Sequence, residues 1–164
     1  MRFRSALFLS SALLAVAFCG TARAVTYDTP ALSVLEEGQG VVALHVTAGS
    51  SGAPAGFIVQ WMSRADYDQL GGWPADGTST AVSSAYFRGA PTLNTADNTN
   101  TFILSPGQAA RVEIGDLFDE TGVGSVNRTE LQANSEYVFR VLAQGNYYAD
   151  ASDPSSIQST RTLP

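Results

Sequence analysis

Four runs of this sequence alternate β-branched or aromatic residues with other residues at a period of two. The runs are residues 41–46, 57–62, 111–114 and 137–144. Turn-forming clusters of glycine, proline and small residues lie at 49–54, 71–72, 75–77 and 105–107. Such alternation is typical of half-buried β-strands. Because no helical period of useful length follows the first 24 residues, the pattern predicts an all-β fold of two antiparallel sheets packed as a sandwich.

The first residues have the pattern of a secretory signal peptide. Arg2 and Arg4 precede an apolar run over residues 6–18, and the small residues of Ala22-Arg23-Ala24 follow. A charged start, a short apolar run and small residues before a cut are the features of such a leader. The run is shorter than the roughly 20 residues of a membrane-spanning helix. We therefore expect residues 1–24 to be removed, with cleavage between Ala24 and Val25.

Composition limits what the remaining chain can bind. Cleavage after Ala24 would leave 140 of the 164 residues, with six arginines against fifteen acidic residues, no lysine and a net charge of −9. Such a surface disfavours nucleic acid and anionic membranes as partners. The one cysteine, Cys19, follows bulky Phe18, which disfavours lipidation. We expect a protein that is secreted, periplasmic or at the cell surface, without disulfides and without membrane insertion after cleavage.

The C-terminal third resembles the fibronectin type III family. Residues 131–143, Leu-Gln-Ala-Asn-Ser-Glu-Tyr-Val-Phe-Arg-Val-Leu-Ala, are similar to the stretch that leads into and forms strand F of that family, with Leu131 six places before a corner tyrosine, Tyr137. The resemblance implies that the Tyr137 ring closes the core edge while its hydroxyl bonds upstream backbone. Residues 152–156 and 160–162 are similar to the approach to strand G and its closing threonine.

The rest of the resemblance is less continuous. Residues 41–46 and 56–61 are similar to strands B and C, although the tryptophan usual on strand B is missing and Trp61 on strand C could fill that volume. The resemblance implies a single domain over residues 25–164, with an insertion at about 64–108. An immunoglobulin-like sandwich of another topology is the alternative.

The insertion holds the aromatic residues that are candidates for binding. We expect strands at residues 85–88 and 101–104, and loops at 64–79 and 89–100. Long loops on a rigid scaffold often bind ligands, so Tyr67, Trp73 and Tyr86 could form a stacking platform for sugar rings. The alternative, which Gly72 and Pro74 beside it favour, is that Trp73 folds back to cover the core edge.

Residues that could carry catalysis or bind metal are few. The one histidine, His45, is predicted on the outer sheet face, away from a Ser-His-Asp arrangement. Weak calcium candidates are Asp66, Asp68, Asp116, Asp119 and Glu120, with Asp150 and Asp153 as a further pair. None fits the spacing of a calcium loop, so solvated acidic turns are the simpler interpretation. Residues 122–124, Gly-Val-Gly, are predicted as a turn, and Asn127-Arg128-Thr129 is a glycosylation sequon.

These observations predict a protein without catalytic activity or cofactor. Our first hypothesis is a module that binds an extracellular protein or glycan, as in adhesion. The alternative is a structural subunit of an extracellular assembly that pairs through sheet edges, with residues 25–30 as a donor strand or simply a loose terminus. A remote alternative is an accessory of a carbohydrate-active hydrolase, because paired carboxylates serve glycosidases but need a deep cleft. The oligomeric state is left open.

Overall fold

The structure is a computed structural model that describes residues 26–75, 77–88, 102–115, 123–127, 131–145 and 151–164. Several sequence predictions lie outside the described residues. They are the signal peptide at 1–24, the loop at 89–100, Asp116, Asp119, Glu120 and Asp150. Within the described part of the chain, no helix has the length and apolar character needed to cross a membrane.

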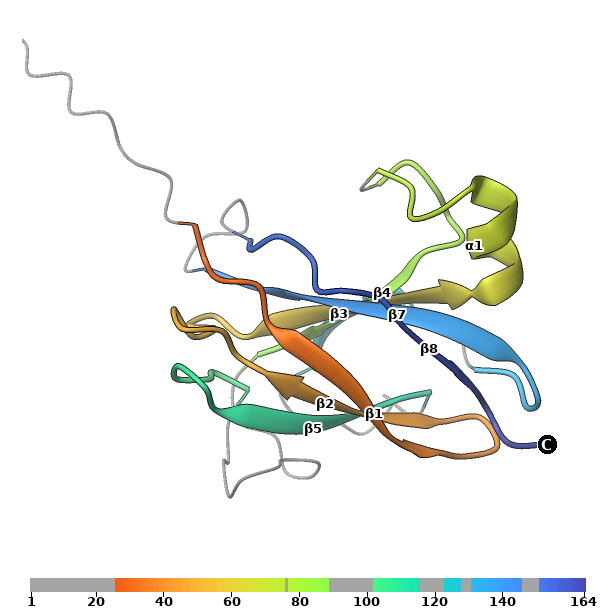
Figure 1. Cartoon of the computed structure of the whole chain (residues 1–164), viewed down its shortest axis with the longest axis horizontal. Coiled ribbons are helices and arrows are strands. Elements are labelled where there is room, and N and C mark those ends of the chain that lie inside the picture. Colours follow the sequence, from red (N-terminus) through yellow and green to blue (C-terminus); the bar gives the residue numbers. More distant parts are fainter. Residues whose placement is uncertain (1–25, 76, 89–101, 116–122, 128–130, 146–150) are drawn as a thin grey trace, which may run out of the picture.

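Eight strands and one short helix make up the described fold (Figure 1). In chain order they are β1 (Ala31–Glu37), β2 (Val42–Thr47), β3 (Phe57–Ser63), α1 (Arg64–Leu70), β4 (Ser83–Phe87), β5 (Ala109–Ile114), β6 (Val123–Asn127), β7 (Glu136–Ala143) and β8 (Gln158–Arg161). The strands form two antiparallel sheets, one ordered β1-β2-β5 and the other β6-β4-β3-β7-β8. The prediction of an all-β fold of two antiparallel sheets is confirmed.

One hydrophobic cluster draws side chains from both sheets. On β2 the alternation holds as expected: Val42, Leu44 and Val46 are fully buried, whereas His45 faces the other way and is half-buried. The buried set on the five-stranded sheet includes Phe57, Val59, Trp61, Phe139 and Val141. Burial of one face of each sheet against the same cluster fixes the strand register, because a shift by one residue would expose the apolar set.

Three phenylalanines pack together at one end of the core. Phe57 and Phe87 stack with ring centroids 5.3 Å apart, and Phe102 meets both rings edge-on at 5.8 and 5.1 Å. A strand is predicted at residues 101–104, but residues 102–104, which the structure describes, do not form one. Leu104 makes only an isolated bridge to Ala53. Phe102 is nevertheless fully buried, so its apolar character serves the core without a strand ladder.

Tyr137 closes the other end of the core beside the turn that precedes β7. Its side chain is 5% exposed, and its hydroxyl accepts a hydrogen bond from the Gln132 backbone N–H at 2.9 Å. Thr162 holds the same turn: its hydroxyl donates to the Gln132 carbonyl at 2.5 Å and accepts from the Ser135 N–H at 2.9 Å. The upstream backbone bond expected of Tyr137 is therefore present.

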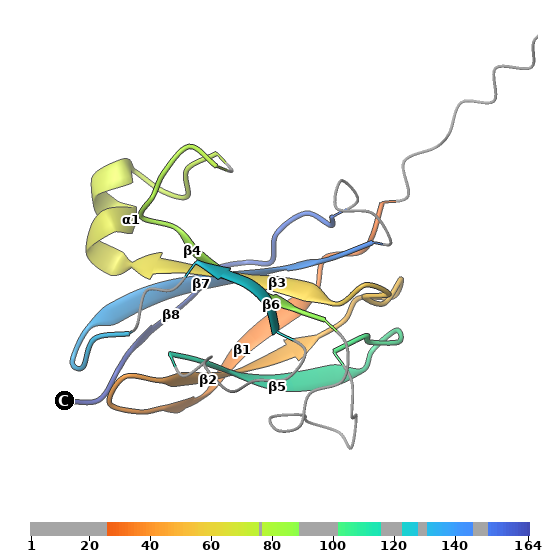
Figure 2. The same cartoon turned by 180° about the vertical axis from the view of Figure 1, so that it is seen from behind.

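Two predictions about local structure, one in the insertion and one after it, are wrong. Residues 64–70, expected in a loop, form helix α1, and residues 123–124, expected in a turn, begin strand β6. Figure 2 shows β6 beside β4 at the edge of the five-stranded sheet. The strand expected at residues 85–88 is confirmed as β4, shifted by two residues at its start.

The described N-terminal segment is part of the domain rather than a loose tail. Tyr27 is 9% exposed and belongs to the core cluster. The Asp28 N–H also ties this segment to the domain, because it donates a hydrogen bond to the Ser51 hydroxyl at 2.5 Å. A tail whose one aromatic ring is already buried in its own core is poorly suited to act as a donor strand for another copy.

Candidate binding site

Local sequence explains why a helix begins directly after β3. Ser63 is the N-cap, and its hydroxyl oxygen accepts from the Asp66 N–H at 3.0 Å. The Ser63 hydroxyl in turn donates to the Asp66 carboxylate at 2.6 Å. Gly71 ends the helix with φ of 73°, a left-handed conformation that glycine adopts without strain. These caps define a seven-residue helix that is too short to show a helical period.

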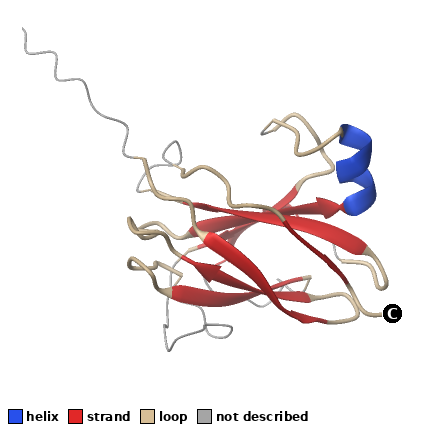
Figure 3. Ribbon diagram, viewed as in Figure 1, coloured by secondary structure: helices blue, strands red, loops and turns tan. Residues whose placement is uncertain are grey.

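Helix α1 and the loop that follows it lie on the side of the five-stranded sheet that faces away from the other sheet (Figures 1 and 3). The helix contacts β3 and β7. Met62 of β3 is 1% exposed and Val138, its neighbour on β7, is fully buried, although neither belongs to the core between the sheets. The insertion therefore covers part of an outer sheet face that alternation alone would leave in solvent.

Trp73 is anchored on this outer face by Arg140 of β7. The guanidinium carbon of Arg140 lies 4.3 Å from the Trp73 ring centroid, a cation–π contact. The Arg140 Nε donates to the Gln60 side-chain oxygen at 2.7 Å, which fixes the guanidinium on the sheet. Tyr67 of α1 meets the Trp73 ring edge-on, with centroids 6.3 Å apart. We call Tyr67, Trp73 and Arg140 the aromatic surface.

The structure brings together two of the three predicted platform residues. Tyr67 and Trp73 are in ring contact, whereas the Tyr86 ring is paired with the Arg88 guanidinium at 4.8 Å. Arg88 also donates to the Gln144 side chain at 3.0 Å. The structure differs from the interpretation in which Trp73 folds back over the core edge. The ring instead covers Arg140 on the outer face of the five-stranded sheet. Trp73 is half-buried, so part of it is available to solvent.

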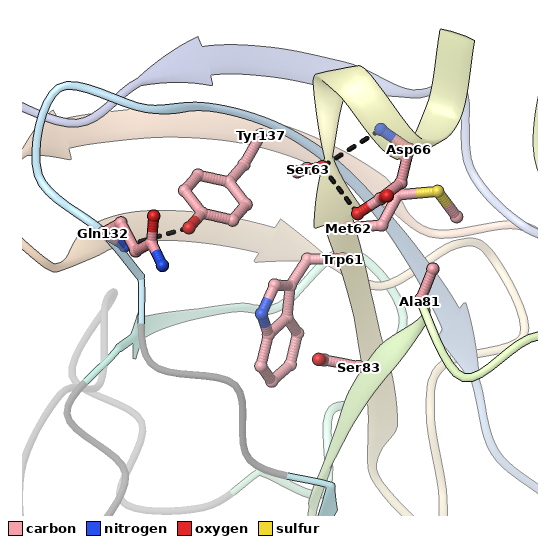
Figure 4. Close-up of a pocket in the computed structure, with 8 residues that line it drawn as sticks. All are labelled: Trp61, Met62, Ser63, Asp66, Ala81, Ser83, Gln132 and Tyr137. Carbon is pink, nitrogen blue, oxygen red and sulfur yellow. Dashed lines mark hydrogen bonds between the residues drawn. The ribbon is translucent and has the colours of Figure 1, made fainter. Parts of the chain in front are cut away.

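A pocket of about 260 Å³ lies between the start of α1 and the turn before β7 (Figure 4). Three segments line it: the end of β3 with α1, the approach to β4, and the start of β7 with its preceding turn. The lining residues are Trp61, Met62, Ser63, Asp66, Ala81, Ser83, Gln132 and Tyr137. It contains none of the residues of the aromatic surface.

An open groove of about 520 Å³ adjoins the pocket, and the two share Ser63 and Gln132. Charged pairs flank this groove: Arg64 contacts Asp68 at 2.9 Å, and Arg161 lies 3.7 Å from Glu136. The hydrogen bond with Asp68 raises the pKa of Arg64 above its ordinary value. The groove is therefore polar and carries both signs of charge.

The described acidic candidates do not form a cation site. Asp66 is occupied by the helix cap and Asp68 by Arg64. Among the described residues, no three His, Cys, Asp or Glu side chains are grouped so that they could hold a metal ion. The cross-strand neighbours of His45 are Ser33 and Arg111, and in the described part of the chain no hydrogen bond joins His45 to a carboxylate. This arrangement lacks the orienting acid of a Ser-His-Asp triad.

Sequence reasoning missed Arg140 and the pocket. Arg140 lies in a run of alternating residues that does not single it out, and only the fold shows that Trp73, distant in sequence, lies on it. The pocket joins three separate segments, so no single motif marks it. The Ser-x-x-Asp pattern at Ser63 and Asp66 followed by Gly71 was a readable signal for the helix that forms its rim.

Comparison of the chain with protein-family models, with curated proteins and with solved structures found no match.

Proposed function

We propose that the chain is an exported, non-catalytic binding module whose residues 25–164 form one fibronectin type III-like β-sandwich. Its partner is an extracellular protein or glycan, held on the aromatic surface. The signal pattern at residues 1–24 supports export, and the anionic chain without lysine supports a partner other than nucleic acid.

Strand order and the Tyr137 contact support this fold type. Sandwiches of this group place strands A, B and E in one sheet and C, F and G in the other. Assigning β1, β2 and β5 to the first set and β3, β7 and β8 to the second is consistent with the strand orders here. The hydrogen bond from the Gln132 N–H to Tyr137 is the contact expected of a tyrosine corner. Strand β6, beside β4, is a departure from that plan.

The contact between Trp73, Tyr67 and Arg140 is the observation that carries the proposal. Tryptophan, tyrosine and arginine are the residue types that contribute most binding energy in protein interfaces. Tryptophan and tyrosine rings also pack on apolar sugar faces and keep a polar group for hydrogen bonding. Trp73 Nε1 is buried and has no hydrogen-bond partner among the described residues, so the exposed part of the half-buried ring is what would contact a partner. A half-buried ring held on a rigid sheet loses little freedom when a partner binds it.

Assembly through sheet edges is the alternative, and the structure gives one observation against it at β1. The register of β1 shifts between Val34 and Glu36, and Leu35, Glu36 and Glu37 are exposed there. Irregularities and charges on an edge strand oppose pairing with another chain. This disfavours β1 as the assembling edge.

The test uses protein exported from cells that express the full chain. Mass spectrometry should find an N-terminus at Val25, and solution mass over a concentration series, with and without calcium, should stay monomeric. Arrays of glycans and of extracellular proteins then identify the partner. Trp73→Ala should weaken its binding by about tenfold or more, whereas Tyr86→Ala should not. Equal losses in both variants, or none in Trp73→Ala, would contradict the proposed surface, and concentration-dependent oligomers would favour the assembly alternative.

A hydrolase accessory role is the remote alternative. It would be favoured if the arrays returned only insoluble polysaccharides that such enzymes degrade. Proteins as the only partners would instead restrict the proposal to adhesion by protein contact.

A further inference from the structure

We propose that the pocket in Figure 4 is a second binding site, which takes one ring of a neutral, hydroxyl-bearing molecule, namely a sugar that is free or at the end of a glycan chain. The site contains none of Tyr67, Trp73 and Tyr86. It therefore stands or fails separately from the aromatic surface.

The first argument is an unsatisfied donor in the pocket wall. Trp61 is 1% exposed, yet its indole Nε1 has no hydrogen-bond partner among the described residues. In Figure 4 this nitrogen lies on the side of the ring that faces Gln132 and Tyr137. Buried donors without an acceptor are rare in native proteins, because their desolvation is not compensated. The nitrogen is closed to water in this structure, so an acceptor oxygen in the pocket would compensate it once the neighbouring side chains move slightly apart.

The Tyr137 hydroxyl is a second donor in the same wall. It accepts from the Gln132 N–H, and that bond leaves the hydroxyl proton to donate. No acceptor for this proton is found among the described residues. The Tyr137 hydroxyl, together with Trp61 Nε1 after that movement, matches a ligand with two neighbouring acceptor oxygens.

Asp66 determines the charge of the ligand. Its carboxylate lines the pocket and accepts from the Ser63 hydroxyl through one oxygen, Oδ2. The other oxygen can accept from a ligand hydroxyl. A carboxylate here repels an anion, and a cation would find the donors of Trp61 and Tyr137 unsuitable. Vicinal hydroxyl groups satisfy all of these partners, because each hydroxyl both donates and accepts.

Size and surroundings indicate a single ring. A volume of about 260 Å³ is slightly below the range of about 300–1,000 Å³ for drug-sized ligands. Met62 and Ala81 provide apolar wall for the C–H face of a sugar. The adjoining groove, which shares Ser63 and Gln132, leaves room for the next unit of a chain.

The two tryptophans of the chain allow a direct test, because its ¹H–¹⁵N spectrum has one indole signal for each. Trp73→Phe assigns the remaining signal to Trp61. The probes are glucose, galactose, mannose and N-acetylglucosamine, followed by disaccharides of each, titrated to tens of millimolar. We expect at least one to shift the Trp61 signal saturably, with a dissociation constant of about 1 mM.

Variants locate the binding. Ala81→Leu fills the pocket and should weaken binding by about tenfold or more, whereas Ala31→Leu, on exposed β1 surface, should not. Ala65 lines the groove but not the pocket. If Ala65→Leu weakens a disaccharide and spares the monosaccharide, the ligand is a chain end. If mono- and disaccharides bind equally and Ala65→Leu spares both, it is a free sugar.

Two results would overturn the proposal. One is a Trp61 signal that no sugar moves, which would mean that the pocket holds water only. The other is a sugar that shifts the Trp73 signal alone, which would retain the aromatic surface as the binding site and remove the pocket. Unfolding midpoints of the Ala81→Leu and Ala31→Leu variants within a few degrees of each other exclude misfolding as the cause of lost binding.

Discussion

Removing the Tyr137 hydroxyl tests how much the corner contact contributes to stability. Tyr137→Phe keeps the ring, which is 5% exposed, and deletes only the oxygen that accepts the Gln132 N–H at 2.9 Å. A net hydrogen bond contributes about 1 kcal/mol, and a buried donor left unsatisfied costs about 1–3 kcal/mol. Gln132 itself is exposed, so water can partly replace the lost acceptor. We therefore expect a loss of about 1–2 kcal/mol in the free energy of unfolding.

Urea unfolding followed by tryptophan fluorescence measures this loss, and Tyr67→Phe is the matched control. The Tyr67 ring is half-buried on α1, and its hydroxyl makes no hydrogen bond within the described part of the chain. The same atom deletion there should change stability by less than about 0.5 kcal/mol. The slope m should be unchanged in both variants, so that a shift in midpoint reports stability. Equal losses at the two tyrosines would refute the reasoning.

Three further predictions use the same unfolding assay. Phe102→Ala should lower the free energy of unfolding by about 3–5 kcal/mol, because it leaves a cavity in the aromatic part of the core. The neighbouring side chain of Ile103 is 47% exposed, so Ile103→Ala should lower it by less than about 0.5 kcal/mol. Gly56→Ala should lower the free energy of unfolding by more than about 4 kcal/mol, since a Cβ there would lie 2.0 Å from a backbone oxygen of β4. At Gly71 an added Cβ meets nothing within 4 Å, so Gly71→Ala should lower it only by the strain of a left-handed backbone, about 1–2 kcal/mol. Ser63→Ala should cost about 1 kcal/mol and speed amide hydrogen exchange in α1 above that in β3; unchanged exchange would argue against the cap.

Alternation predicted the strands that place every second side chain in the shared core. It found β2, β3, β5 and β7 because each places one face in the shared core. It could not show that Met62 and Val138, on the opposite face, are also buried, since what covers them is the insertion. Their burial depends on a tertiary contact that a period of two does not encode.

The errors have separate physical causes. Helix α1 is seven residues long, so it shows no period, and its caps were the only local signal. Strand β6 is an edge strand in a segment with glycines, where local propensity is weak. Phe102 and Leu104 are buried with Ile103 exposed between them, as a strand would be, but among the described residues this segment forms an isolated bridge to Ala53 and not a strand ladder. Burial pattern and ladder formation are therefore distinct properties.

The two tryptophans connect both proposals to one physical problem. Each indole N–H is buried and has no hydrogen-bond partner among the described residues, Trp61 inside the pocket and Trp73 on the outer face. Phenylalanine would remove the unsatisfied donor at either position, but it is smaller than tryptophan and would leave a cavity at the fully buried Trp61. Trp61→Phe should therefore lower stability by no more than about 1–2 kcal/mol, because the cavity is partly offset by loss of the unsatisfied donor, and each variant should weaken binding at one site. Binding that stays intact in both variants would assign the two rings to the scaffold.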